Sequence, residues 1–258
     1  MSVVIAAALR GTPLGRALAA PDRLLDGSGS RFVKDHRRTA VAATTVEGRE
    51  IFVKHFKPYA WYRRLEWMFT ITPARRCWAR SVELEAAGFR VAPPLALAET
   101  RRYGMPADCY FVTSGVAGAE PAGRFWRERA AGLPIRERRS LLVALARELR
   151  HFHDSGFYSR DANADNFLAR RSAATDPEFF LLDLENVRRL RSVSPRRRAK
   201  NLVQLYRPIR GEVEVRDRLR FLRAYAREPL PSLRTWLATL EKLDAAKEAE
   251  YRARRREG

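Results

Sequence analysis

Asp161 and Asn166 lie five positions apart in the polar segment "FYSRDANADNFLARR", which occupies residues 157–171. This D-x-x-x-x-N spacing is that of a kinase catalytic loop, in which the carboxylate orients or deprotonates the acceptor hydroxyl and the amide oxygen binds Mg²⁺. A lone match means little, because Asp and Asn form turns in many loops. The pair therefore indicates phosphoryl transfer only if the other parts of the machinery are present.

Two further residues supply those parts. Phosphoryl transfer from a nucleotide needs metal ligands at the phosphates and a cation that holds the phosphate oxygens. Asp183 follows the apolar run "FFLL", where a carboxylate at the end of a strand would bind the metal, and Lys54 lies in the strand-like "IFVKHF". Taken singly, Lys54 could face solvent and Asp183 could cap a helix. The joint order of the four residues favours a nucleotide site.

The segments around Lys54 predict an antiparallel β unit. Residues 31–56 are rich in β-branched and aromatic side chains, which predicts two or three strands with a hairpin at Glu47–Gly48. A further pair of strands is predicted at "PPLALAET" and "DCYFVTSGV", on either side of a turn around "RRYGMPA".

A helix is predicted between these strand pairs. Thr72 suits the N-cap, Pro73 suits the first helical position and Gly88 lies just past the end. Glu85 falls on the stripe that carries the apolar side chains of this helix, whereas Glu83 points about 180° away at about 100° per residue. Glu85 is the better candidate for the acidic partner of the strand lysine, and an ordinary surface role for either glutamate stays open.

The second half of the chain has helical periodicity. In residues 135–156 the apolar positions recur at three-to-four spacing until Gly156 ends the run, and the later segments are mostly helical. His151 and His153, at the end of this helix, suit its dipole better than a metal site. A strand-rich part followed by a helix-rich part predicts an α+β, bilobal architecture. The expected domains are a helical arm at 1–30, a β-rich nucleotide-binding lobe at 31–116 and a helical catalytic lobe with a basic tail at 117–258.

Charge and cysteine content limit the setting. The chain of 258 residues carries 50 Lys and Arg against 30 Asp and Glu, a net charge of +20, which attracts polyanions such as nucleic acid, anionic lipid headgroups and phosphorylated glycans. Cys77 and Cys109 are too few for a disulfide framework and lack metal-ligand spacing, which favours a reducing compartment. No apolar run is long enough to span a bilayer, and no signal peptide is evident, so a cytoplasmic location is expected.

The segments "FHDSGFYSRDANADNFLAR" and "FFLLDLENVRRLR" resemble the catalytic core of the lipopolysaccharide core kinases, which phosphorylate heptose or Kdo sugars. The resemblance extends through "ARRCWARSVELEAAGFRVAPPLAL", "CYFVTSGVAGAEP" and "RRRAKNLVQLYR", and covers roughly residues 31–226. It implies a protein-kinase-like fold with an antiparallel sheet in the first lobe and helices in the second. The implied roles are catalytic base for Asp161, Mg²⁺ ligands for Asn166 and Asp183, and phosphate binding for Lys54.

The resemblance also implies the cofactors and partners. ATP and Mg²⁺ are the expected cofactors, and main-chain groups near Ser114 to Val116 would meet the adenine. The expected acceptor is a sugar hydroxyl of the lipopolysaccharide core glycolipid. The protein would then act as a peripheral enzyme at the cytoplasmic face of the inner membrane, where its positive charge steers it to an anionic surface. Nucleic acid is not an expected partner, and no feature of the sequence sets an oligomeric state.

Some features depart from protein kinases. Ser159 stands where protein kinases carry His, and the metal motif reads Asp-Leu-Glu instead of Asp-Phe-Gly, so regulation of the protein-kinase kind is not expected. The loop "KDHRRTA" between the first two strands has no glycine for close backbone approach to phosphates. Arg37 and Arg38 could hold phosphate oxygens there, or the loop could be a solvated turn.

Two other readings stay open. A non-catalytic, kinase-shaped binder of nucleic acid or anionic membrane would explain the charge but would leave Asp161, Asn166 and Asp183 as coincidence. A kinase-like enzyme acting on a protein or a small soluble acceptor would use the same catalytic residues. In addition, "KPYAWYRRLEWMF" at residues 57–69 interleaves aromatic and basic residues, which suits a membrane interface, a glycan groove or a half-buried helix edge.

Overall fold

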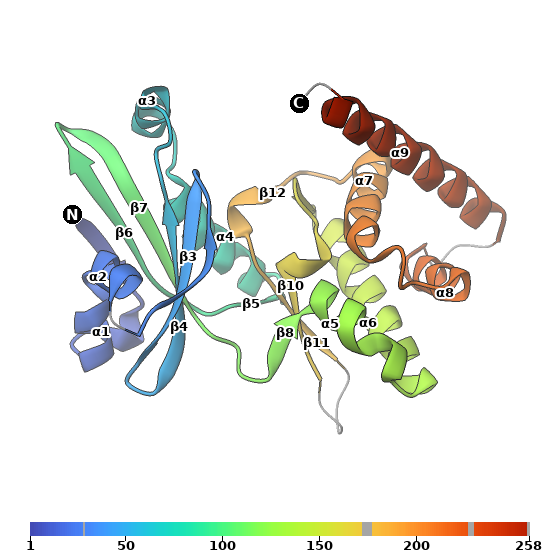
Figure 1. The fold of residues 1–258 in the computed structure, drawn as a ribbon, viewed down its shortest axis with the longest axis horizontal. Helices are drawn as coiled ribbons and strands as arrows, with labels where there is room; N and C mark the ends of the chain where they lie inside the picture. The colour runs from blue at the N-terminus through green and yellow to red at the C-terminus, as the bar shows by residue number, and fades with distance from the viewer. Residues whose placement is uncertain (28, 172–176, 227–229, 257–258) are drawn as a thin grey trace. The chain divides into compact units, whose positions relative to one another are not determined.

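The structure, a computed structural model, describes residues 1–27, 29–171, 177–226 and 230–256. The chain packs into two units, which Figure 1 shows by residue number. The sheet unit comprises residues 1–117 with 183–185, and the helical unit comprises 118–182 with 186–258. No helix in the described part of the chain has the length and apolar composition of a membrane span.

The sheet unit contains most of the strands. Its elements are β1 (Ser2–Ile5), η1 (Ala7–Leu9), α1 (Pro13–Leu18), α2 (Pro21–Asp26), β2 (Arg31–Asp35), β3 (Thr39–Val46), β4 (Arg49–Phe56), α3 (Trp61–Phe69), α4 (Pro73–Ala86), β5 (Arg90–Val91), β6 (Pro94–Arg102) and β7 (Met105–Ser114). Six of the strands form one antiparallel sheet in the order β1-β6-β7-β4-β3-β2, so β4 lies in its interior.

The two hairpins predicted in this sheet are confirmed. At the turn between β3 and β4, Glu47 and Gly48 have φ values of 51° and 70°. At the turn between β6 and β7, Tyr103 and Gly104 have φ values of 52° and 76°. Two successive residues with positive φ match the twist of an antiparallel pair, which is why a glycine at the second position marks such turns in a sequence.

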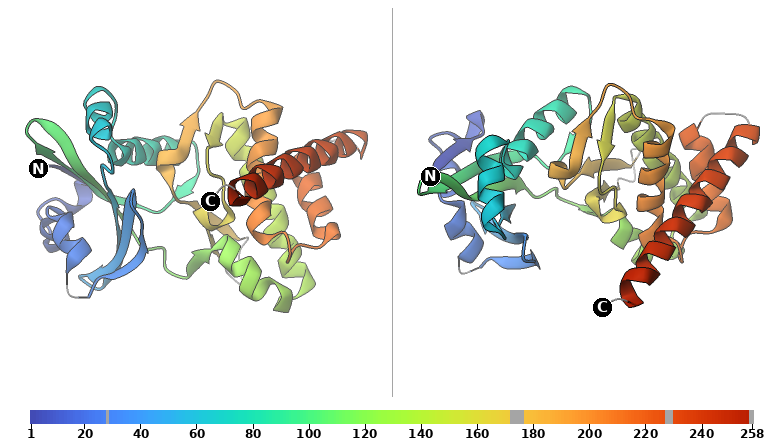
Figure 2. Two further views of the ribbon diagram at one scale, coloured as in Figure 1. Left: turned by 45° about the horizontal axis from the view of Figure 1, so that its top comes forward. Right: turned by 90° about the horizontal axis from the view of Figure 1, so that it is seen from above.

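The N-terminal segment differs from the expected helical arm at residues 1–30. The run "SVVI" forms β1, which pairs with β6 through Val4 and Leu97, among other residues. The two short helices α1 and α2 then bury Leu14, Leu18 and Leu25 in the core of the sheet unit, and they lie beside the sheet in Figures 1 and 2. The expectation of a peripheral arm is wrong, because four extended residues are enough to add an edge strand once a partner strand is available.

Helix α4 follows the predicted capping chemistry. The Thr72 hydroxyl accepts a hydrogen bond from the Arg75 N–H at 3.3 Å, and Pro73 occupies the first turn. The helix ends at Ala86, and Gly88 takes a φ of 85° just beyond it. Its buried face consists of Ala74, Cys77, Ser81 and Leu84.

The helical unit contains the remaining elements. They are β8 (Ala119–Pro121), α5 (Ala122–Arg129), η2 (Ala130–Gly132), α6 (Ile135–Asp154), β9 (Phe157–Ser159), η3 (Ala164–Asn166), β10 (Phe167–Arg170), β11 (Glu178–Leu181), β12 (Val187–Arg189), α7 (Pro195–Tyr206), η5 (Arg207–Ile209), α8 (Val215–Ala226) and α9 (Leu230–Arg256). The short helix η4 (Leu184–Asn186) is divided between the units, since only Asn186 belongs to the helical one. The strands are short: β10 pairs with β8 and β11, and β12 pairs with β9. Helix α9 packs along α7 and α8.

The long predicted helix is α6, and it ends as expected. Leu142, Leu149 and Phe152 are buried along one face, and Gly156 takes a φ of 83° after the last turn. Ile135 begins the helix on the surface with 52% of its area exposed, so the apolar face starts one turn or more later than the sequence pattern indicates. The sheet-rich first unit and helix-rich second unit confirm the α+β class.

Candidate active site

Lys54 and Asp183, two of the predicted site residues, form an ion pair in the sheet unit. A second carboxylate joins them: Glu185 lies 2.5 Å from the Lys54 Nζ. The three side chains are mostly buried, with 16% to 23% of their area exposed. The structure therefore brings the predicted lysine and the predicted metal ligand together, and it adds Glu185, an acidic residue with no role predicted from the sequence.

Strand β4 determines where the lysine points. Ile51 and Val53 are fully buried in the core, and side chains alternate between the faces of a strand. Lys54 therefore emerges on the opposite face, with the Phe56 ring 5.1 Å from its ammonium group. The antiparallel neighbours β3 and β7 on both sides keep this stretch of backbone fixed.

The two carboxylates keep Lys54 charged. Burial alone would lower the pKa of Lys54, but the charges of Glu185 and Asp183 outweigh it and raise that pKa above its ordinary value. Burial raises the pKa of Glu185, and the neighbouring Lys54 opposes this shift. Asp183 has a φ of 58°, a backbone conformation that non-glycine residues rarely adopt. Such conformations concentrate at functional sites.

Helix α4 contributes a thiol to this cluster. The buried Cys77 lies with its Sγ 3.6 Å from the Glu185 Oε2. Burial and the charge of Glu185 raise the pKa of Cys77 well above its ordinary value, so the thiol is neutral and donates to the carboxylate. Glu185 thus uses one oxygen for the lysine and the other for α4. We refer to Lys54, Asp183, Glu185 and Cys77 as the lysine cluster.

The acidic partner of Lys54 is not the residue favoured by the sequence. Glu85 is exposed, and Glu83 forms an ion pair with Arg80 at 2.5 Å. The inward stripe of α4 runs through Cys77 and Leu84, and at about 100° per residue the next position after Leu84 has already turned towards solvent. The partner, Glu185, is the third residue of the Asp-Leu-Glu motif, and this motif was the signal available in the sequence.

Asp161 and Asn166 come together in the helical unit. The Asn166 Nδ2 donates to the main-chain oxygen of Asp161 at 2.9 Å, which closes the loop between them. The Asp161 N–H donates to the Ser159 hydroxyl at 3.1 Å, so the serine that replaces the histidine of protein kinases holds the loop from the other side. Asp161 is exposed, so its carboxylate is accessible.

Two side chains from α7 hold the loop that carries Asp161. The Asn201 amide donates to the Ser159 carbonyl at 2.7 Å, and its oxygen accepts from the Ser159 N–H at 3.2 Å. The Gln204 amide donates to the Arg160 carbonyl at 2.8 Å. Sequence reasoning predicted this helix but missed these two residues. The only signal in the sequence was a polar residue, Asn201, among the apolar positions of this helix.

The second aspartate of the loop has a different role. Asp165 accepts a hydrogen bond from the Arg124 N–H at 2.8 Å and so caps the first turn of α5. Arg127 pairs with the same carboxylate at 3.1 Å. A Cβ on Gly123 would lie 2.5 Å from the Asp165 Oδ1, so the close approach needs glycine. Asp165 therefore fastens the loop to α5.

His153 extends this network into the core. It is 1% exposed, its Nε2 lies 3.1 Å from the Asn201 Oδ1, and its Nδ1 lies 2.7 Å from the Tyr225 hydroxyl oxygen. The Asn201 Oδ1 is an acceptor, so Nε2 carries a proton, and in the neutral ring Nδ1 accepts from the Tyr225 hydroxyl. Burial lowers the pKa of His153 to about 4.

We expect the free energy of unfolding to fall as the pH drops from about 6.5 towards 4. In that window the unfolded chain binds a proton at His153 and the folded chain does not, so protons favour unfolding. The loss should reach about 3 kcal/mol near pH 4. Urea denaturation at four pH values between 7.5 and 4.5 measures it. His153→Gln should make the free energy of unfolding nearly independent of pH in this window. His36→Gln, at an exposed position, should leave the pH dependence as in wild type. An unchanged pH dependence in His153→Gln would contradict the assignment of this effect to His153.

The ligand types at Asp183 and Asn166 fit Mg²⁺. No group of three or more His, Cys, Asp or Glu side chains suited to a metal occurs among the described residues. Mg²⁺ differs from structural metals here, because it is held through one or two protein oxygens plus substrate phosphates. Asp183 offers a carboxylate. Asn166 uses its amide nitrogen for the loop, which leaves its amide oxygen as a ligand for a hard cation.

The segment expected to meet the adenine follows β7. The Ser114 N–H donates to the Pro93 carbonyl at 2.9 Å, and the Gly115 N–H donates to the Glu50 carbonyl at 2.7 Å. A contact from Ser114 to a base would therefore come from its carbonyl group. Val116 is half-buried and lies one residue before the end of the first segment of the sheet unit.

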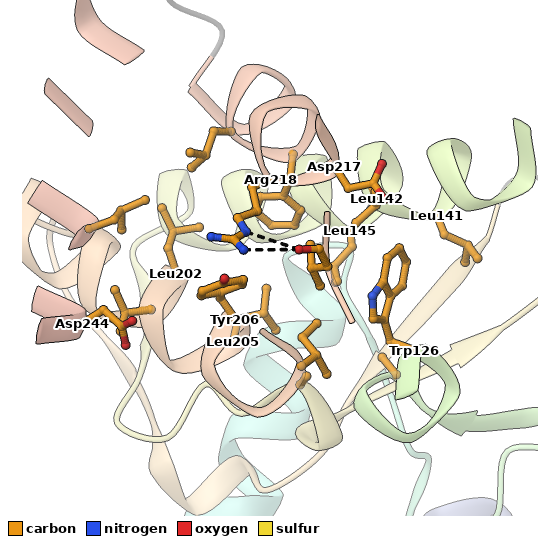
Figure 3. Close-up of a pocket in the computed structure, with 18 of the residues that line it drawn as sticks. Trp126, Leu141, Leu142, Leu145, Leu202, Leu205, Tyr206, Asp217, Arg218 and Asp244 are labelled. Atoms are coloured by element: carbon orange, nitrogen blue, oxygen red, sulfur yellow. Dashed lines mark hydrogen bonds between the residues drawn. The ribbon is translucent and has the colours of Figure 1, made fainter. Parts of the chain in front are cut away.

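A separate cavity of about 210 Å³ lies within the helical unit. Its lining is mostly apolar and comes from α5, α6, α7, α8 and α9, as Figure 3 shows for Trp126, Leu145, Leu202 and Tyr206. The buried Trp126 Nε1 has no hydrogen-bond partner among the described residues. The cavity is thus a mostly apolar chamber whose lining also includes Asp217, Arg218 and Asp244, unlike the polar lysine cluster.

Comparisons with known proteins identify a family and relatives that this chain is similar to. A model of the lipopolysaccharide kinase (Kdo/WaaP) family matches residues 30–225. The chain is 31% identical over 229 residues to the lipopolysaccharide core heptose(I) kinase WaaP of Pseudomonas aeruginosa, covering 83% of this chain and 84% of that protein. It is also similar to a solved structure of WaaP in complex with acyl carrier protein, with a TM-score of 0.67, 25% identity and coverage of 95% of this chain and 99% of the other.

Proposed function

The chain belongs to the lipopolysaccharide kinase (Kdo/WaaP) family, and from that premise we propose how it transfers a phosphoryl group. Family membership makes it a kinase, a phosphotransferase with an alcohol group as acceptor, and that acceptor is a sugar of the lipopolysaccharide inner core. The resemblance stated from the sequence and the kinase-like fold are both confirmed. The reading as a non-catalytic binder is not favoured.

We propose that ATP is the phosphoryl donor and that Lys54, Asp161, Asn166 and Asp183 act on it together. Lys54 would hold phosphate oxygens, and Asp161 would orient the acceptor hydroxyl and take up its proton. Asn166 and Asp183 would hold Mg²⁺, which neutralises charge on the phosphates when bound. Main-chain groups of Ser114 and Val116 would meet the adenine.

The lysine cluster is the observation that carries this proposal. A buried lysine between two carboxylates, one of them on a residue with positive φ, is costly to build for stability alone, since desolvation offsets much of the attraction between the charges. A phosphate-binding site explains the arrangement. The lysine remains charged, and the carboxylates keep it in place until phosphate oxygens compete for its protons.

We propose heptose as the acceptor sugar, because the curated relative is named for that sugar. Purified protein should transfer label from γ-labelled ATP to dephosphorylated core lipopolysaccharide that contains heptose. A core truncated after Kdo should remain unlabelled. Transfer to the truncated core would redirect the assignment to Kdo, and absence of transfer to either core, with intact ATP binding, would direct the search to a protein or small soluble acceptor.

We also propose that the protein works as a peripheral enzyme at the cytoplasmic face of the inner membrane. An acceptor anchored by lipid is presented at a membrane surface, and the net charge of +20 favours the anionic leaflet. ATP is available on the cytoplasmic side. Nucleic acid has no place in this function.

The cavity in the helical unit supports a proposal about a second partner. The solved neighbour is in complex with acyl carrier protein, and we propose that this chain assembles with an acyl carrier protein whose acyl chain enters the cavity. An apolar chamber suits an acyl chain, and the Trp126 N–H would meet a polar atom of the ligand.

Leu145→Trp should weaken binding of palmitoyl-loaded carrier by about tenfold or more, because the larger side chain fills the space of several methylene groups. Isothermal titration with loaded and unloaded carrier measures this. The exposed Ile135→Trp on the same helix is the matched control and should bind like wild type. Equal affinity of wild type for loaded and unloaded carrier would contradict the proposal, and the melting temperature reports whether Leu145→Trp stays folded.

A further inference from the structure

Helix α3 turns its apolar face towards solvent. It packs beside β7 at one end of the sheet, as Figure 1 shows, and Trp67 is its buried side chain. At about 100° per residue, five large side chains fall within an arc of about 120°, roughly opposite Trp67. All five are exposed, including 75% of Trp61 and 84% of Phe69. This α3 face consists of Trp61, Tyr62, Leu65, Met68 and Phe69.

The orientation of the apolar face of α3 is the reverse of that in most surface helices. A surface helix normally directs its apolar stripe at the core and its charged residues at water. A continuous exposed patch of this kind marks a contact surface, in contrast to apolar residues that are scattered singly. Ile71, two residues after the helix, is also exposed, by 60%.

A group of cations lies at the start of α3, on the side of the helix that carries Arg63 and Trp67. Arg37, Arg38 and Arg63 surround the Tyr59 ring, with guanidinium carbons 5.9 Å, 4.7 Å and 5.3 Å from its centroid. Arg63 also donates to the Tyr59 hydroxyl at 2.9 Å. The tip of the β2–β3 hairpin and the first turn of α3 are therefore joined into one basic cluster, which we call the Tyr59 cluster.

We propose that the α3 face inserts into the surface of an anionic phospholipid bilayer while the Tyr59 cluster binds the lipid phosphates. The nine-residue helix is about 14 Å long, far too short to span a bilayer but suited to lie in its interface. Tryptophan and tyrosine favour that depth, and arginine can reach from apolar surroundings to a headgroup. The proposal gives the docking element for the peripheral location proposed above, but it does not depend on kinase activity.

A second copy of the chain fits this surface less well than lipid does. A symmetric contact would bring the same patch of both copies together, and the two Tyr59 clusters would then lie close to each other. Arg37 and Arg38 on each side would repel, whereas Arg63 pairs with Glu66 and adds less to this repulsion. A phospholipid offers the complementary pattern instead, with an apolar tail for the α3 face and an anionic phosphate for the cluster.

Co-sedimentation with vesicles tests the proposal without nucleotide or sugar. Wild type should bind vesicles of phosphatidylcholine with 30% phosphatidylglycerol, and binding should weaken in pure phosphatidylcholine or at high salt. The double variant Trp61→Ser, Phe69→Ser should bind at least about tenfold more weakly, because it removes the two most exposed members of the face. Ile135→Ser with Val215→Ser, at exposed apolar positions elsewhere, should bind like wild type.

Tryptophan fluorescence shows which element enters the bilayer. Vesicles with brominated acyl chains should quench wild type, and Trp61→Phe should lose most of the quenching. Wild-type affinity of the Trp61→Ser, Phe69→Ser variant, or failure of wild type to bind, would overturn the proposal. So would a wild-type dimer that this variant abolishes, which would assign the face to a second copy. A variant that fails on vesicles but phosphorylates delipidated core oligosaccharide separates this result from the proposed kinase function.

Discussion

Asp161→Asn is expected to lower kcat for phosphoryl transfer by about 10²–10⁴-fold, the range lost when a positioned general base is removed. Asparagine has nearly the same shape but cannot accept the proton of the acceptor hydroxyl. The loop should persist, because the hydrogen bonds of Asp161 to Ser159 and Asn166 use main-chain groups. ATP binding should therefore change little. Initial rates with labelled ATP and dephosphorylated core lipopolysaccharide, together with nucleotide titrations, measure both quantities.

Asp165→Asn is the matched control within the same loop. Asp165 caps α5 through the Arg124 N–H and pairs with Arg127. Asparagine keeps the cap and loses the ion pair, so this change should lower the free energy of unfolding by at most about 1 kcal/mol and leave kcat within a few-fold of wild type. The two aspartates thus separate chemistry from loop anchoring. A kcat for Asp161→Asn above a tenth of wild type, or a larger loss in Asp165→Asn, would contradict the assignment of the base.

Local chemistry explains which elements the sequence predicts well. The turn at Glu47–Gly48 needs two residues that tolerate positive φ, and the start of α4 needs a hydroxyl at Thr72 and tolerates Pro73. Each of these two features depends only on residues within four positions of one another. Hydrophobic periodicity places α6 for the same reason, because one face of a helix can be read from the spacing along its own segment.

Contacts between distant segments explain what the sequence does not reveal. Strand β1 pairs with β6, about ninety positions later, and no property of "SVVI" identifies that partner. The same limit applies to the lysine cluster, where Lys54 and Glu185 are separated by 131 positions. Motif spacing identifies Asp183, whereas the protein-kinase pattern places the acidic partner of the lysine on a helix. Nor could periodicity alone show that the apolar face of α3 points outwards, since the same stripe normally marks a buried face.

Glu185→Gln is expected to lower kcat/KM for ATP by about 10- to 100-fold, which corresponds to about 1.4–3 kcal/mol, the range of a hydrogen bond to a charged group. The amide keeps the shape of the side chain and can still contact Cys77. It removes one of the two negative charges that hold the ammonium group of Lys54. The lysine then pairs with Asp183 alone, so its position at the phosphates becomes less defined. The free energy of unfolding should change by less than the activation free energy does, because the site is partly open to solvent.

The exposed Glu85 provides the matched control, because it is the residue that a helix-borne partner would require. Glu85→Gln should leave kcat/KM unchanged. If Glu85→Gln is impaired and Glu185→Gln is not, the lysine changes partners during catalysis and the cluster seen here represents a resting arrangement. Cys77→Ala tests the remaining link, between α4 and Glu185. It leaves a buried carboxylate oxygen of Glu185 without its donor, so ATP turnover should fall, but less than in Glu185→Gln. Cys77→Ser restores a hydroxyl donor and should recover most of this loss. Recovery by serine but not by alanine would show that α4 positions the lysine through Glu185, a route that replaces the direct glutamate of protein kinases.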